Sequence, residues 1–155
     1  MSKTLESRLS EAAAHYLGRF ESNEQKLRMV LRRRVERWGE SDAETAIEAV
    51  IAKFKRLGAV DDARYAAAKA SSMARAGKSR RAISAYLSAR GIDKEIIGEQ
   101  DTDDLAAAQR LAQKKRLGPF RTPETRSQNR DRDLAALGRA GFSWEIARRV
   151  IDSDD

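Results

Sequence analysis

The chain has 155 residues and a formal net charge of +7, with 35% charged and only 6% aromatic residues. It has no cysteine, which excludes a disulfide scaffold and a cysteine-built metal site. Few prolines and glycines interrupt a composition rich in helix formers. No apolar run is long enough for a membrane span, and the first residues lack the apolar core of a signal peptide. We therefore expect a helical, cytoplasmic protein whose basic excess suits a polyanionic partner.

The first third of the sequence predicts three helices. Apolar residues recur every three or four positions over residues 5–20, which is the spacing of one helix face. Ser22 with Gln25 forms the pattern of a capping box for a second helix, and Ser41 with Glu44 forms another for a third. The third helix carries the cleanest amphipathic stripe in the chain, made by Ile47, Val50, Ile51, Phe54 and Leu57.

The middle of the sequence predicts three more helices separated by glycine. Asp61 can cap the first of them, and Gly77 ends it. Ser79 can then cap the second helix, which ends at Gly91. Asp93 begins a short third helix.

The last third predicts a further set of three helices. Thr102 or Asp103 caps the first, and Gly118-Pro119 breaks it. Pro123 stands at the first position of the next helix, where its missing N–H costs little. Ser143 caps the last. Because no segment predicts a strand convincingly, the fold class is all-α.

The predicted helices recur in threes. Residues 87–96 match residues 137–146 at Leu, Gly, Glu and Ile with a constant offset of 50 residues. Each set of three helices buries little apolar surface alone, so neighbouring sets should pack on one another as an elongated, curved array. Three-helix modules are predicted in tandem at residues 9–58, 61–100 and 103–152.

The sequence offers little for catalysis. His15 is the single histidine, and no nucleophile–base arrangement is visible. The acidic pairs Asp61-Asp62 and Asp103-Asp104 each open the first helix of a predicted module, where the helix dipole favours acids. We interpret them as helix-start residues rather than metal ligands. The protein is therefore expected to be no enzyme and to use no metal or cofactor.

Basic residues collect in three runs. Residues 26–37 hold six basic residues and one acid, residues 69–90 hold six and none, and residues 110–121 hold five and none. Like charges one helical turn apart repel, so each run is either a solvated helix face or a surface for phosphates or an acidic protein. The candidate residues for binding a partner or nucleic acid are Arg28, Arg32, Arg33, Arg37, Lys78, Arg80, Arg81, Arg90, Lys114 and Lys115.

Several segments resemble the RecX family of regulatory proteins. The most specific are residues 57–66, 75–79 and 87–92, and residues 14–31 and 137–142 fit the same family. The resemblance implies tandem three-helix modules without catalytic activity. It also implies a bacterial regulator that binds the RecA recombinase and its filament on single-stranded DNA, and inhibits recombination and strand exchange in DNA repair and the SOS response. We expect a monomer that does not bind membranes.

The sequence departs from the repeat and leaves a second function open. Asp133 stands where Ile83 predicts an apolar residue. A helix-turn-helix transcriptional regulator is the alternative, with residues 79–90 as its recognition helix, although that helix has few base-reading Asn or Gln residues. Trp38, Trp144 and Phe142 could stack on bases, but their helical spacing indicates core or turn positions. Whether protein or DNA is the main contact also stays open.

Overall fold

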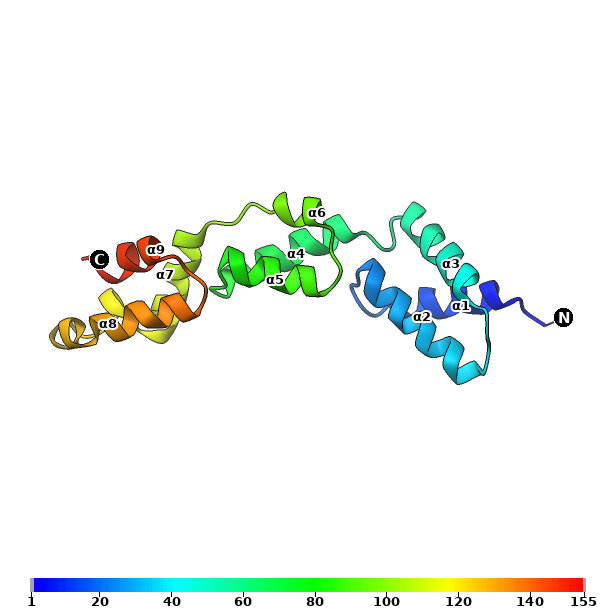
Figure 1. Ribbon diagram of the computed structural model, residues 1–155, viewed down its shortest axis with the longest axis horizontal. Coiled ribbons are helices and arrows are strands. Elements are labelled where there is room, and N and C mark those ends of the chain that lie inside the picture. The colour runs from blue at the N-terminus through cyan, green and yellow to red at the C-terminus, as the bar shows by residue number, and fades with distance from the viewer. Residues whose placement is uncertain (1, 155) are drawn as a thin grey trace. The chain divides into compact units, whose positions relative to one another are not determined.

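The computed structural model describes residues 2–154, and every regular element within them is a helix (Figure 1). The all-α prediction is therefore confirmed. A short 3-10 helix, η1 (Gly118–Phe120), precedes α8. The α-helices of the described residues are α1 (Leu5–Leu17), α2 (Glu24–Trp38), α3 (Glu44–Arg56), α4 (Asp62–Arg75), α5 (Arg80–Ala89), α6 (Lys94–Gly98), α7 (Asp104–Lys115), α8 (Pro123–Arg139) and α9 (Trp144–Ile151).

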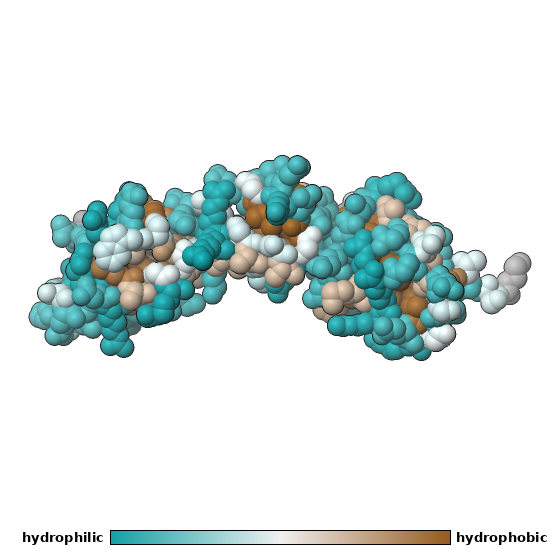
Figure 2. All heavy atoms as spheres, viewed as in Figure 1, coloured by the Kyte–Doolittle hydropathy of each residue, from teal (hydrophilic) through white to brown (hydrophobic). Residues whose placement is uncertain are grey.

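Backbone contacts divide the chain into two compact units. The N-terminal unit runs as far as Tyr65 and includes Arg90–Ile92, and the C-terminal unit consists of Ala66–Ala89 and the residues from Asp93 onward. Each unit has a buried apolar cluster, around Leu31 in the first and around Leu137 in the second. On the face drawn in Figure 2, most of the surface of each unit is hydrophilic, and small apolar patches lie among the hydrophilic residues. The division into three modules stays a prediction.

Helix starts in the middle of the chain follow the predicted caps. The Arg64 backbone N–H donates to Asp61 Oδ1 at 3.1 Å, and the Ala82 N–H donates to Ser79 Oγ at 3.1 Å. These bonds satisfy N–H groups that the helix itself leaves without an acceptor. The predicted caps at Asp61 and Ser79 are confirmed.

Both predicted capping boxes near the N-terminus are wrong. Helix α2 is capped by Asn23, whose Oδ1 accepts from the Lys26 N–H at 2.9 Å, while Ser22 is buried and its Oγ donates to the Asn23 carbonyl. Helix α3 begins after Ala43 without a side-chain cap. The left-handed backbone of Asp42, with φ of 55°, separates Ser41 from that helix start.

The apolar stripe of α3 is buried except at its last position. Leu57 is 67% exposed because it lies beyond the end of the helix, where the chain turns at Gly58 with φ of +71°. Trp144 is also 62% exposed at the start of α9, so its predicted place in a core or turn is wrong, whereas Trp38 is half-buried beneath the Arg8 guanidinium.

The start of α2 is held by two segments from later in the chain. The carboxylate of Asp62 accepts a hydrogen bond from the Glu24 backbone N–H at 2.8 Å. The backbone at Gly91 lies so close to Gln25 that a Cβ there would be 2.5 Å from Gln25 Oε1. Gly91 also has φ of +76°, which favours glycine. These contacts explain why Arg90–Ile92 belongs to the N-terminal unit.

The start of α5 repeats this arrangement inside the C-terminal unit. Asp104 Oδ1 accepts from the Arg80 backbone N–H at 2.8 Å. The turn at Gly141 lies against Ser79, where a Cβ would be 2.5 Å from Ser79 Oγ. The same hydroxyl donates to the Ala140 carbonyl at 3.2 Å. The starts of α2 and α5 are thus held by later segments of the chain in the same way.

The two acidic pairs therefore have divided roles. Asp61 and Asp103 each cap their own helix, as the sequence predicts. Asp62 and Asp104 instead reach the N-terminus of an earlier helix, which the sequence does not predict.

A buried ion pair stands in the C-terminal unit where the repeat predicts an apolar residue. Asp133 is fully buried, and its carboxylate accepts two hydrogen bonds from Arg121 at 2.7 and 2.8 Å and one from the Gly118 N–H at 2.8 Å. Burial alone would raise the pKa of Asp133, but the bonds from Arg121 and Gly118 outweigh it and hold that pKa below its ordinary value. Asp133 thereby anchors η1 to α8.

Replacing Asp133 with alanine should lower the free energy of unfolding by about 3 kcal/mol, because Gly118 and Arg121 both lose their acceptor. We expect no larger loss of stability because the Arg121 side chain is 24% exposed and is therefore partly solvated. Urea denaturation measures it. Asp131→Ala is the control, since the Asp131 side chain is 98% exposed, and should change stability by less than about 0.5 kcal/mol. Equal losses for the two variants would contradict the assignment.

The same carboxylate should make stability depend on pH. Its folded pKa is lower than the unfolded value of about 3.9, so its contribution is complete above that value and is lost as the pH falls through the folded pKa. Below about pH 4, the free energy of unfolding of the wild type should therefore fall more steeply than that of Asp133→Asn. Parallel curves would show that Asp133 does not titrate differently in the two states.

Candidate functional site

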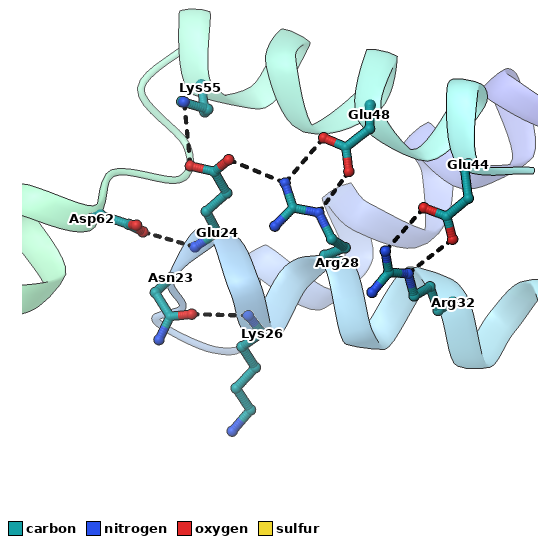
Figure 3. Close-up of polar contacts among 9 residues, drawn as sticks. All are labelled: Asn23, Glu24, Lys26, Arg28, Arg32, Glu44, Glu48, Lys55 and Asp62. Atoms are coloured by element: carbon teal, nitrogen blue, oxygen red, sulfur yellow. Dashed lines mark hydrogen bonds and ion pairs between the residues drawn. The ribbon is translucent and has the colours of Figure 1, made fainter. Parts of the chain in front are cut away.

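Two of the predicted binding arginines form ion pairs inside the N-terminal unit (Figure 3). Arg28 on α2 contacts Glu48 on α3 through two hydrogen bonds of 2.6 and 3.0 Å. Arg32 contacts Glu44 in the same way at 2.9 and 3.0 Å. These two-point contacts align the guanidinium and carboxylate groups and join the two helices.

Glu24 extends this network to the end of α3. One carboxylate oxygen of Glu24 accepts from Arg28 at 3.2 Å, and the other lies 3.2 Å from Lys55 Nζ. The hydrogen bonds from Arg28 lower the pKa of Glu48 and so keep that carboxylate ionised. The charges of Arg28 and Lys55 are consequently balanced within the unit.

On a second face of α2, the described carboxylates do not balance the positive charges. Lys26, Arg33 and Arg37 lie on one side of the helix, because they are seven and four residues apart. All three are exposed, and none forms an ion pair with another described residue. Figure 3 shows the Lys26 side chain directed away from α3. Of the predicted residues in this run, Arg33 and Arg37 therefore offer uncompensated charge, and Arg28 and Arg32 do not.

In the C-terminal unit, three predicted residues line one hollow of about 520 Å³. Lys78 lies between α4 and α5, and Lys114 and Lys115 lie in the last turn of α7. Arg139, in the last turn of α8, is the fourth cation. No carboxylate lines this hollow, and its four cations form no ion pair within residues 2–154. We call it the basic hollow.

Arg139 lines the basic hollow but is not among the binding residues predicted from the sequence. The repeat aligns it with Ala89, so the matching helix gave no precedent for a cation there. Its position three residues after Ala136 and one before Ala140, both of which line the hollow, could not be recognised without the packing of α8 on the rest of the unit.

The remaining predicted residues lie elsewhere. Arg80 and Arg81 are exposed at the start of α5, and Arg90 is exposed but takes part in an intramolecular interaction. The start of α5 itself is occupied, because Ser79 is fully buried and Asp104 accepts from the Arg80 N–H. A recognition helix reads base edges with its N-terminal residues, so this packing disfavours the helix-turn-helix alternative.

Two further features bear on function. Within the described part of the chain, no group of three or more His, Cys, Asp or Glu residues is placed to hold a metal ion. Among the helices of residues 2–154, none has both the length and the apolar character that a membrane crossing requires.

Comparison with known proteins places the chain in a family. Residues 61–99 match the model of the second three-helix domain of RecX. A regulatory protein RecX from Myxococcus xanthus is 45% identical over 159 aligned residues, which cover 94% of this chain and 85% of the relative. The chain belongs to the RecX family.

Other RecX proteins match shorter stretches. The protein from Agrobacterium fabrum is 35% identical over 61% of this chain and 53% of its own length, and that from Thermobifida fusca is 36% identical over 68% and 59%. No solved structure matches. These relatives are named regulatory proteins and not enzymes, in agreement with the regulatory role that the resemblance implies.

The pairing of Arg28 predicts a difference in stability between two arginines on α2. Arg28→Ala should lower the free energy of unfolding by about 1 kcal/mol, because it breaks contacts with both Glu48 and Glu24. Arg33→Ala removes the same side chain from an unpaired position and should change stability by less than about 0.5 kcal/mol. Urea denaturation of both variants checks this. A larger loss for Arg33→Ala would show that the pairing is assigned to the wrong arginines.

Proposed function

We propose that the chain binds the RecA recombinase and its filament on single-stranded DNA, and that it inhibits strand exchange and recombination. This is the function that the resemblance to RecX implies, and the family assignment supports it. In this role the protein acts as a cytoplasmic monomer in DNA repair and the SOS response.

The observation that carries the proposal is the separation of paired from unpaired cations. Arg33 and Arg37 keep their charge on an exposed helix face, although carboxylates of the same unit neutralise Arg28 and Arg32. In the other unit, none of the described residues that line the basic hollow is acidic. Clustered positive charge without an internal counter-charge is stabilised by an anionic partner such as a filament on DNA.

Two basic surfaces on one chain can bind a repetitive partner more tightly than either could alone. Once one surface is bound, the other meets the next site on the filament at a high effective concentration. A chain held in this way would occupy filament surface that incoming duplex DNA must otherwise contact. Inhibition of strand exchange would then follow from binding alone, without chemistry.

Binding to RecA filaments should weaken as the salt concentration rises. Arg33→Ala/Arg37→Ala should weaken it by about 5- to 30-fold, equivalent to about 1–2 kcal/mol, and should make the salt slope shallower by about 2 if both arginines contact phosphates. Biolayer interferometry on filaments assembled on immobilised oligothymidylate measures both quantities.

The matched control is Lys94→Ala/Arg149→Ala, which removes two exposed charges from other positions. It should bind almost as the wild type does. Binding that does not change with salt would overturn the electrostatic part of the proposal. Tight binding to one duplex sequence without recombinase would favour the helix-turn-helix alternative instead.

A further inference from the structure

We propose that the basic hollow binds an acidic peptide segment that carries an aliphatic side chain among its carboxylates. The inference rests on the proposed function and deepens it, because it makes protein rather than nucleic acid the ligand of this site. Its ligand would be an exposed acidic segment of the protein partner.

The charge of the hollow is not balanced from inside. Lys114 and Lys115 lie at the C-terminal end of α7, and Arg139 lies at that of α8, where helix dipoles favour cations. Each helix end supplies the equivalent of only about half a negative charge. Since Lys78 adds a fourth cation and no carboxylate among residues 2–154 lines the hollow, net positive charge is left for a ligand.

The uncharged residues that line the hollow, which we call its floor, are apolar and mostly small. They include Leu111, which is partly buried, together with Ala82 and Ala136. A volume of about 520 Å³ falls within the range of about 300–1,000 Å³ that is typical of ligand pockets. Such a floor can accept an aliphatic side chain while the surrounding cations bind carboxylates.

The same lining argues against nucleic acid. Sites for single-stranded DNA stack bases on aromatic side chains, and none of the described residues that line this hollow is aromatic. A ligand that presents carboxylates and one aliphatic group matches both the charge and the floor, whereas a chain of phosphates and flat bases matches only the charge.

Close contacts join the elements that line the hollow. Gly77 has φ of +88° and lies so near Leu111 that a Cβ would be 3.0 Å from the leucine Cβ. Arg110 Nη1 donates to the Ala74 carbonyl at 3.2 Å, which joins α7 to α4. A site whose walls are already fixed loses little conformational entropy on binding.

The test uses the full-length protein and a fluorescein-labelled peptide of four glutamates around a central leucine, read by fluorescence anisotropy. The wild type should bind this peptide, and should bind versions with glutamine for glutamate or serine for leucine more weakly. Lys114→Ala/Lys115→Ala should weaken binding by about 5- to 30-fold. Lys94→Ala/Arg149→Ala removes equal charge elsewhere and should have little effect.

A filling variant separates the hollow from general electrostatics. Ala82→Leu keeps every charge but occupies the floor, so it should weaken binding as strongly as the double lysine variant does. Ala136→Leu fills the same floor from α8 and serves if the first variant loses helical circular dichroism. Wild-type peptide affinity in a folded filling variant would overturn the inference. Failure of the wild type to bind the peptide would overturn it too. So would wild-type binding of oligothymidylate that is lost in Lys114→Ala/Lys115→Ala and kept in the other variants.

Filament binding is measured in parallel on the same proteins. If the wild type binds filaments in a salt-dependent way but ignores the peptide, the inference fails and the proposed function stands. If the wild type binds the peptide in the hollow but no filament, the proposed function fails, and the identity of the partner fails with it.

Discussion

The placement of carboxylates decides how the helices are joined and which cations are left for a partner. Asp62 and Asp104 each accept a backbone N–H from the start of an earlier helix. Such groups have no acceptor within their own helix, so each bond satisfies a donor and joins two segments. Glu44 and Glu48 similarly hold arginines of α2 against α3. Acidic residues that take part in these contacts do not neutralise basic residues elsewhere on the surface.

These internal ion pairs help a chain with many basic residues to fold. A chain with this excess of positive charge must fold despite the repulsion between its basic residues, and internal ion pairs reduce that repulsion where helices meet. Uncompensated charge is left at exposed positions, such as Arg33 and Arg37. Paired and unpaired arginines therefore alternate along one helix, as Arg32 and Arg33 do.

Much of the fold could be predicted from the sequence, because helix periodicity and glycine stops are local signals. The buried stripe from Ile47 to Phe54 and the cap at Ser79 follow from spacing alone. Caps at Asn23 and the exposure of Leu57 could not be predicted, since neighbouring polar residues compete for a cap and the exact helix end decides burial. The basic runs of the candidate site could be predicted from the sequence. Which cations are paired could not, because it depends on acids 12 or 20 residues away. The contribution of Arg139 to the hollow could not be predicted either, because it depends on packing.

The central claim is that the unpaired cations of α2 and of the basic hollow, rather than the basic surface as a whole, meet the partner. Site-specific photo-crosslinking with benzoylphenylalanine tests it most directly, with the probe placed in turn at Arg33, Lys115, Glu99 and Asp131, all of which are exposed. In the presence of RecA filaments on single-stranded DNA, the first two positions should crosslink to the filament and the two acidic positions should not. Equal crosslinking at all four positions, or crosslinking confined to Glu99 and Asp131, would contradict the account.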